Sequence, residues 1–105
     1  MAGALISVVY PSAPDAKFDL EYYNTKHMGL VTEKWGNKGL QQYWVADLRP
    51  SNGPYAIQAT MLWDSVESFQ KAAASEDSAA VFADVANFTN LKAVVLSGAI
   101  VKSSN

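Results

Sequence analysis

The sequence predicts a single α+β domain, residues 1–105, in which two helical segments pack on one face of a four-stranded antiparallel sheet. Two observations lead to this fold class. The predicted elements follow one another in the order βαββαβ, and a turn rich in proline joins the two middle strands into a hairpin. A chain of 105 residues also has room for one hydrophobic core. Together these features indicate the ferredoxin-like split βαβ arrangement.

The first third of the chain is predicted to form a strand followed by a helix. Ala4 to Tyr10 is a run of apolar, partly β-branched residues that ends at a proline. Asp15 or Asp19 is expected to cap a helix that continues to about Trp35, because either carboxylate can accept hydrogen bonds from the first unpaired amides. Gly29 lies inside this helix and predicts a kink or a break there.

The middle of the chain is predicted to form a hairpin, with strands at Leu40–Arg49 and Tyr55–Trp63 joined by the turn Pro50–Pro54. Asp47 and Gln58 are polar residues inside these strands, and buried polar groups need partners. We therefore expect a structural role for both.

The last third predicts a helix broken in two and a final strand. Asp64 or Ser65 is expected to cap a helix from Val66 to about Ala74. A second helical segment follows from Ala79 to about Phe88, and Ala93–Lys102 is the fourth strand.

The predicted strands carry apolar residues on both faces, most clearly in Val94–Val101. A sheet with one face in water should instead alternate apolar and polar residues. Because the helices cover only one face, the second face needs another cover. The simplest cover is the same sheet of a second copy, which gives a two-fold homodimer with the sheets packed face to face.

The composition excludes several classes of function. The chain has no cysteine, which rules out disulfides, thiolate chemistry and cysteine-ligated metal centres. Its 8 basic and 10 acidic residues leave no basic patch, so no nucleic-acid partner is expected. No apolar stretch approaches the ~20 residues of a membrane span. The first residues do not resemble a signal peptide, so we expect a cytoplasmic protein without a membrane partner.

His27, the only histidine of the chain, is the main candidate for chemistry. At about 100° per residue, Leu20, Tyr23, Leu30 and Val31 fall on the same face of the predicted helix. His27 is a candidate general base, because its ordinary pKa of about 6.5 suits proton transfer near neutral pH. Tyr23 could orient a substrate oxygen, while a purely structural role stays open for both side chains. His27 has no companion ligands at metal-binding spacing, so no metal site built from side chains alone is expected. Ligation of a haem iron by His27 stays open and would need a dedicated cavity.

The other candidates are side chains that could frame a pocket around His27. An aromatic lining favours a flat, apolar ligand. The predicted substrate-binding residues are Tyr22, Asn24, Leu30, Val31 and Trp63. Asp84 is interpreted as a cap or turn residue.

The sequence also resembles a known family. The run Phe18-Asp19-x-x-Tyr22-Tyr23-x-x-x-His27-Met28-x-Leu30-Val31 is similar to the signature helix of the EthD family, within the dimeric α+β barrel superfamily. The segments Trp63–Phe69 and Asp84–Thr89 are similar to its second helix and to the turn before its last strand. One position departs from the family pattern, because the residue after Met28 is often proline and here is Gly29.

The resemblance implies an oxidoreductase, monooxygenase-like, or a related proton-transfer enzyme that needs no organic cofactor. Its substrate would be a small apolar or aromatic compound, with His27 and Tyr23 as catalytic residues. Similar proteins include oxygenases of anthrone-type substrates, dehydratases, cyclases and a component needed for ether breakdown. No glycine-rich dinucleotide loop is present, so neither NAD nor a flavin is expected. The alternative is a non-catalytic dimer that binds an apolar metabolite or assists a degradation pathway.

Overall fold

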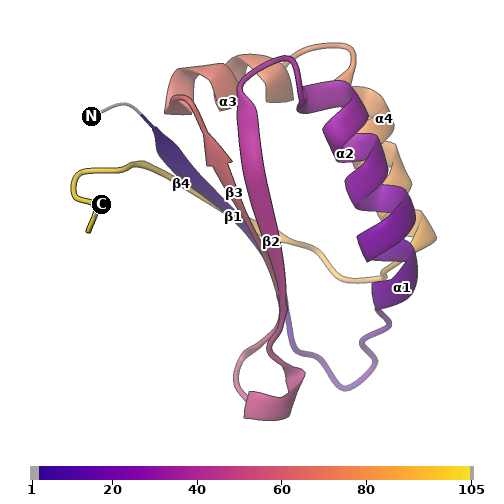
Figure 1. Ribbon diagram of the computed structural model, residues 1–105. Helices are drawn as coiled ribbons and strands as arrows, with labels where there is room; N and C mark the ends of the chain where they lie inside the picture. The colour runs from indigo at the N-terminus through magenta and orange to yellow at the C-terminus, as the bar shows by residue number, and fades with distance from the viewer. Residues whose placement is uncertain (1–2, 105) are drawn as a thin grey trace.

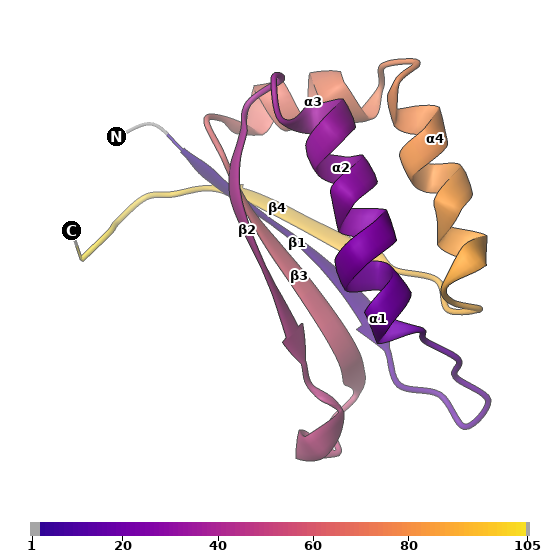
Figure 2. The same ribbon diagram turned by 45° about the vertical axis from the view of Figure 1, so that its right-hand side comes forward.

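The helices lie against one face of a four-stranded sheet in the structure, a computed structural model that describes residues 3–104 (Figures 1 and 2). The strands are β1 (Ala4–Pro11), β2 (Leu40–Asp47), β3 (Tyr55–Trp63) and β4 (Val94–Ala99). They lie in the order β2-β3-β1-β4, and each neighbouring pair is antiparallel. The ferredoxin-like α+β fold expected from the element order is therefore confirmed.

The first helical segment contains a change of helix type. It consists of α1 (Leu20–Tyr22), the π-helical segment η1 (Tyr23–His27) and α2 (Met28–Trp35). The backbone N–H of Met28, the residue that follows η1, donates to the carbonyl of Tyr23 five residues earlier. This i to i−5 hydrogen bond is the π-helix pattern. Gly29 lies in regular α-helix, so the irregularity comes before the position that the sequence indicated.

The two helix starts for which the sequence offers candidate caps, those of α1 and α3, both have a side-chain cap. Asp19 Oδ1 accepts the backbone N–H of Tyr22 at 3.0 Å, and Ser65 Oγ accepts that of Ser68 at 3.0 Å. Ser65 opens α3 (Val66–Ala73).

The second helical region and the hairpin turn differ in detail from the prediction. α4 (Ser78–Ala83) continues as a 3₁₀ segment, η3 (Asp84–Asn87), rather than as α-helix to Phe88. A second 3₁₀ turn, η2 (Arg49–Ser51), ends β2 early at Asp47. The Asp47 carboxylate accepts hydrogen bonds from the Arg49 guanidinium at 2.9 Å, so the two polar residues pair at the strand end.

The core fills the space between the sheet and the helices. Alternate residues of β3, from Ile57 to Trp63, are buried on the helix-facing side. Trp35 of α2 packs on Trp63 with ring centroids 5.6 Å apart, and its Nε1 donates to Ser78 Oγ at 2.8 Å. These contacts join α2, α4 and the sheet into one core.

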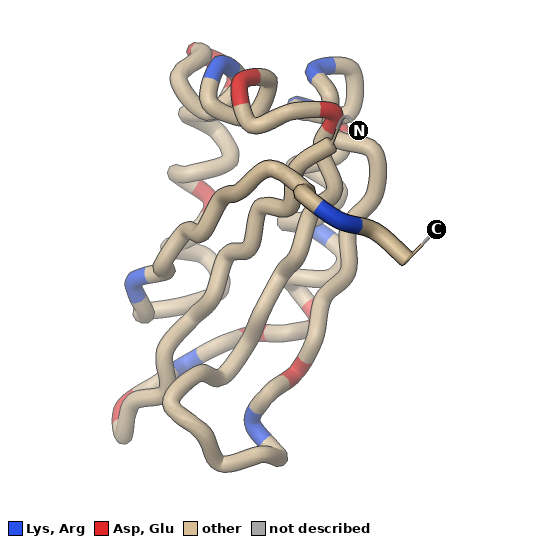
Figure 3. Tube along the Cα trace, turned by 90° about the vertical axis from the view of Figure 1, so that its left-hand side faces the viewer, with Lys and Arg blue, Asp and Glu red and all other residues tan. Residues whose placement is uncertain are grey.

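The opposite face of the sheet is uncovered. The register places Leu5, Trp44, Val94 and Leu96 on it, and these side chains are 43% to 54% exposed. Figure 3 views this face and shows charged residues mainly around its edges. Asp47 is the only charged residue within the four described strands. Among the described residues, no helix is long and apolar enough to cross a membrane.

Candidate functional site

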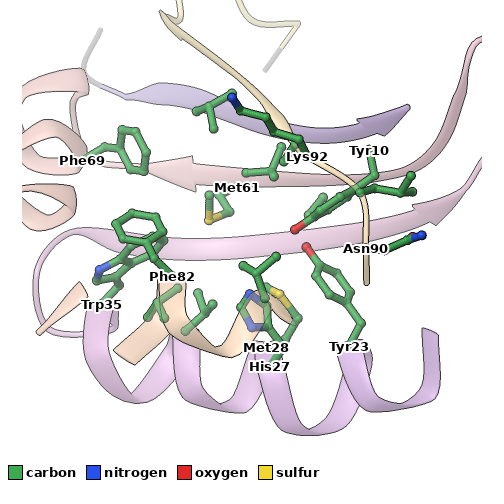
Figure 4. A pocket seen from close by; sticks show the side chains of 18 residues that line it. Tyr10, Tyr23, His27, Met28, Trp35, Met61, Phe69, Phe82, Asn90 and Lys92 are labelled. Atoms are coloured by element: carbon green, nitrogen blue, oxygen red, sulfur yellow. The ribbon is translucent and has the colours of Figure 1, made fainter. Parts of the chain in front are cut away.

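A cavity of about 570 Å³ lies between the helices and the sheet. Its walls come from η1, α2, α4, β1 and β3 and from the coil that precedes β4 (Figure 4). Most of the lining is apolar, for example Val8, Met61 and Val81. Phe82 and Val95 line it while remaining 53% exposed, so they mark its mouth. The volume lies within the ~300–1,000 Å³ typical of small-molecule sites.

His27 lies in the wall of this cavity and is held by Asp84. The distance between His27 Nδ1 and Asp84 Oδ2 is 2.9 Å. Asp84 Oδ1 also accepts the Tyr22 hydroxyl at 2.7 Å and the Asn87 amide at 3.0 Å. Both oxygens of the carboxylate are thus engaged, which fixes its orientation toward the imidazole.

The protonation state of His27 follows from these contacts. Burial lowers the pKa of His27, and the hydrogen bond and charge of Asp84 offset only part of that effect. Burial opposes ionisation of Asp84, but hydrogen bonds from Tyr22, Asn87 and His27 together lower its pKa. At neutral pH an ionised carboxylate therefore faces a neutral imidazole. Since a carboxylate only accepts, Nδ1 carries the proton and Nε2 keeps its lone pair.

The free nitrogen of His27 is open to the cavity. Nε2 has no hydrogen-bond partner among the described residues. Among the described residues, only Trp63 Nε1 is a fully buried side-chain nitrogen or oxygen without a hydrogen-bond partner. Because His27 Nε2 also lacks a partner, it is not fully enclosed. An unpaired base at the edge of an apolar cavity can accept a proton from a bound molecule.

Two tyrosines lie beside His27. The Tyr23 ring stacks on the imidazole, with centroids 5.1 Å apart and planes 20° apart. Tyr10 reaches the same region from the end of β1, and the two hydroxyl groups point toward one another in Figure 4. Burial raises the pKa of Tyr10 to about 12 and that of Tyr23 further, so both phenols stay protonated at neutral pH.

The structure separates the predicted site residues into three groups. His27, Tyr23 and Val31 line the cavity. Tyr22 reaches the site only through its hydrogen bond to Asp84. The remaining three lie away from the cavity: Asn24 is exposed, Leu30 is half-buried at the edge of the core, and Trp63 is fully buried within it.

Asp84 and Tyr10 are part of the candidate site, and the sequence interpretation missed both. Asp84 lies 57 residues after His27, and only the fold brings the two together. The Asp84–Thr89 segment was noticed for its resemblance, yet its aspartate was interpreted as a turn residue. For Tyr10, strand alternation was a usable signal, because Ile6 and Val8 share its face.

The described residues around the cavity include few side chains of the types that bind metal ions. Among the described residues, no group of three or more histidine, cysteine, aspartate or glutamate side chains lies close enough to hold a metal ion. His27 with Asp84 alone supplies one imidazole and one carboxylate, both already hydrogen-bonded to each other.

Comparison with known proteins identifies the fold in solved structures. No family model and no curated protein matches the sequence. An EthD-like protein from Ralstonia eutropha JMP134 is 26% identical, with a TM-score of 0.82 over 97% of this chain and 95% of that chain. An ethyl tert-butyl ether D (EthD) family protein from Bacillus halodurans C-125 is 23% identical, with a TM-score of 0.67 over 93% and 97%.

More distant structures share the fold alone. SnoaB, a cofactor-independent oxygenase from Streptomyces nogalater, is 6% identical, with a TM-score of 0.68 over 99% of this chain and 97% of that chain. A dimeric ferredoxin-like protein of unknown function from Thermobifida fusca YX is 15% identical, with a TM-score of 0.64 over 94% and 92%. The EthD-like structures match over nearly the full chain, and the residues around His27 resemble the same family, so the chain is similar to EthD-like proteins in fold and in this segment.

Proposed function

We propose that this protein is an enzyme that removes a proton from a small apolar or aromatic compound bound in the cavity, with His27 as general base. One observation carries the proposal: His27 is paired with Asp84 at 2.9 Å, while its other nitrogen is open to an apolar cavity of about 570 Å³. This arrangement resembles the base and its orienting carboxylate in other proton-transfer enzymes.

Each group has a defined part in the first step. The lone pair of His27 Nε2 accepts a proton from an acidic O–H or C–H of the ligand, and the imidazole becomes a cation. Asp84 holds the ring in the required tautomer and stabilises that cation across the 2.9 Å contact. Tyr23 supports the ring by stacking, and the apolar walls limit the access of water.

The anion left on the ligand then determines the type of reaction. In the oxygenase form of the proposal, a carbanion gives electrons to dioxygen and combines with it to form a hydroperoxide. Loss of one water from the hydroperoxide leaves a carbonyl, so a CH₂ group and O₂ give C=O and H₂O. The fold of SnoaB, a cofactor-independent oxygenase, supports this form.

The same base also supports a lyase or cyclase. Proton removal next to a carbonyl can be followed by loss of a hydroxyl group as water or by carbon–carbon bond formation within the ligand. All these reactions share the step at His27, and they differ in what the bound anion does next.

The test compares three variants with the wild type. The substrate is an anthrone, whose methylene protons are acidic. Exchange of these protons for deuterium, followed by NMR, measures proton removal, and oxygen uptake measures oxidation. We expect His27→Gln to lower the exchange rate by about 10²–10⁴-fold. Asp84→Asn should lower it by about 10²-fold or more, because the amide no longer fixes the tautomer. The control Asp77→Asn, at an exposed position outside the cavity, should match the wild type.

Two outcomes would count against this mechanism. Unchanged exchange in His27→Gln would mean that another group removes the proton. Tight binding of the anthrone with no exchange in any form would favour the non-catalytic ligand-binding or accessory role instead.

We also propose that the protein is a homodimer formed through the uncovered face of the sheet. Leu5, Trp44, Val94 and Leu96 are exposed there, and within the described strands only Asp47 carries a charge. Exposed apolar area of this kind marks interfaces more often than free surface. The dimeric ferredoxin-like protein from T. fusca gives a precedent for a dimer of this fold. An uncharged apolar face that meets the same face of a second copy suits a two-fold contact.

A further inference from the structure

The hydroxyl groups of Tyr10 and Tyr23 form a second polar feature of the cavity wall, besides His27. Tyr10 comes from the end of β1 and Tyr23 from η1, and each side chain is 2% exposed. Both line the cavity, and their oxygens point toward one another (Figure 4). Two buried phenols are a costly way to fill a core, because each hydroxyl needs a partner there.

One of the two phenol protons has no acceptor in the described part of the chain. The two hydroxyl groups face one another (Figure 4), and a pair of hydroxyls that bond to each other uses only one of its two protons. Neither tyrosine has a further side-chain hydrogen bond among the described residues, so the second proton has no acceptor there. An O–H donor without an acceptor, in the wall of a cavity, is available to a ligand.

The charges around the cavity favour a negative ligand. Lys92 is the only Lys or Arg among the described lining residues; it is exposed and makes no ion pair with any described residue. No Asp or Glu is part of the described lining. Asp84 stands behind His27, where three hydrogen bonds hold it away from the ligand space.

We infer that the cavity binds its ligand as an oxyanion, with the Tyr10 hydroxyl as the direct hydrogen-bond donor to the anionic oxygen and Tyr23 as the donor behind it. The substrate class is therefore a phenol, an enol or a ketone that forms an enolate. The proton goes to His27 Nε2, and the negative charge stays on the oxygen beside Tyr10. This inference rests on the proposed function, since it requires a ligand that loses a proton in the cavity.

The test uses two probes of nearly the same shape. 4-Nitrophenol has an acidic proton, and its phenolate has its own visible absorbance band; 4-nitroanisole carries a methyl ether instead. Titration with each probe over a pH series gives the affinity for both and the pKa of the bound phenol. The proteins are the wild type, Tyr10→Phe, and the control Tyr43→Phe, which changes an exposed tyrosine outside the cavity.

In the wild type we expect the pKa of the bound 4-nitrophenol to fall below that of the free phenol. Tyr10→Phe should weaken binding of the phenolate by about tenfold or more, as for a lost hydrogen bond to a charged group. Binding of 4-nitroanisole should not change in this variant, and Tyr43→Phe should behave as the wild type with both probes.

The results that would overturn the inference are distinct from those that would overturn the proposed function. If 4-nitroanisole binds but the pKa of the bound phenol equals that of the free phenol, the cavity is a ligand site without oxyanion preference. Equal weakening of both probes by Tyr10→Phe would show a packing role only. If neither probe binds the wild type, the inference and the aromatic-ligand site both fail.

Discussion

At the scale of single residues, two opposing effects act on His27. Burial disfavours the imidazolium, and the Asp84 carboxylate favours it; burial is the larger, so the pKa of His27 is lowered. A base of this kind is uncharged at neutral pH and has a stabilising anion in place for the moment when it accepts a proton. This is the state that a general base needs before reaction.

The lowered pKa makes a prediction for stability at acidic pH. In the unfolded chain His27 takes up a proton near its ordinary pKa of about 6.5, whereas the folded protein resists this until lower pH. The unfolding free energy should therefore fall as the pH drops below about 6.5, with a slope of at most about 1.4 kcal/mol per pH unit. Asp84, whose pKa is also lowered, adds a further loss only below about pH 4.

Urea unfolding of the wild type and His27→Gln between pH 7 and pH 5 would measure this effect. The wild type should lose stability across that range, and the variant should lose less, because the titrating group is gone. Equal slopes in the two proteins would show that His27 is not kept neutral by burial.

At the scale of elements, the π-helical segment η1 sets how Tyr23 and His27 lie together. Both residues are within it, and their rings stack on the cavity side. π-Helical turns inside α-helices are frequent at functional sites, since they add a residue to the turn and re-aim side chains. The backbone returns to α-helix at Met28, so the irregular geometry is confined to the two residues of the site and those between them.

Two glycines give opposite predictions for element stability. Gly29 has helical surroundings and no atom within 4 Å of an added Cβ, so Gly29→Ala should stabilise the protein by about 0.5–1 kcal/mol. Gly39 has a φ of +126°, and an added Cβ would lie 2.7 Å from Asp64 Oδ1. Gly39→Ala should therefore destabilise by more than about 1 kcal/mol.

Chemical denaturation of both variants against the wild type is the measurement. A destabilising Gly29→Ala would indicate that the helix after η1 needs the conformational freedom of glycine at this position.

Most strands and helices could be predicted from the sequence, but contacts between distant segments of the chain could not. The residues of β3 alternate and are bounded by turn signals, so Tyr55–Trp63 was predicted with its observed limits. No local signal marks η1, whose Tyr23 and His27 rings pack against Phe88 from a distant part of the chain. The contact of Asp84 with His27 arises only when α4 and α2 pack together, which no local pattern encodes.

At the scale of the whole molecule, the cavity and the uncovered face lie on opposite sides of the sheet. The cavity uses the helix-facing residues of β1 and β3, and the proposed dimer uses their alternate neighbours. A substitution can therefore change one function and leave the other intact, because adjacent strand residues point to opposite faces.

Two adjacent residues of β4 provide a matched test of the dimer. Leu96 is 54% exposed on the uncovered face, and Val95 is 53% exposed on the helix-facing side. Leu96→Lys should shift the protein from dimer to monomer, since a charge would be buried between the sheets. Val95→Lys adds the same charge to the same strand and should leave the dimer intact.

Analytical ultracentrifugation at micromolar concentration distinguishes the two variants. A wild type that sediments as a monomer would contradict the proposed dimer. Equal effects of both substitutions would place the interface elsewhere.

The positions of the three tryptophans give the molecule internal optical reporters. Trp44 is 49% exposed on the uncovered face, Trp35 lines the cavity with its Nε1 bonded to Ser78, and Trp63 is buried in the core. Indole fluorescence depends on the polarity around the ring and on nearby quenchers. Self-association should thus alter mainly the emission of Trp44, and a nitroaromatic in the cavity should quench mainly Trp35. In an unlabelled sample, Trp44 therefore reports on the uncovered face, and Trp35, with Trp63 packed 5.6 Å from it, reports on the cavity side.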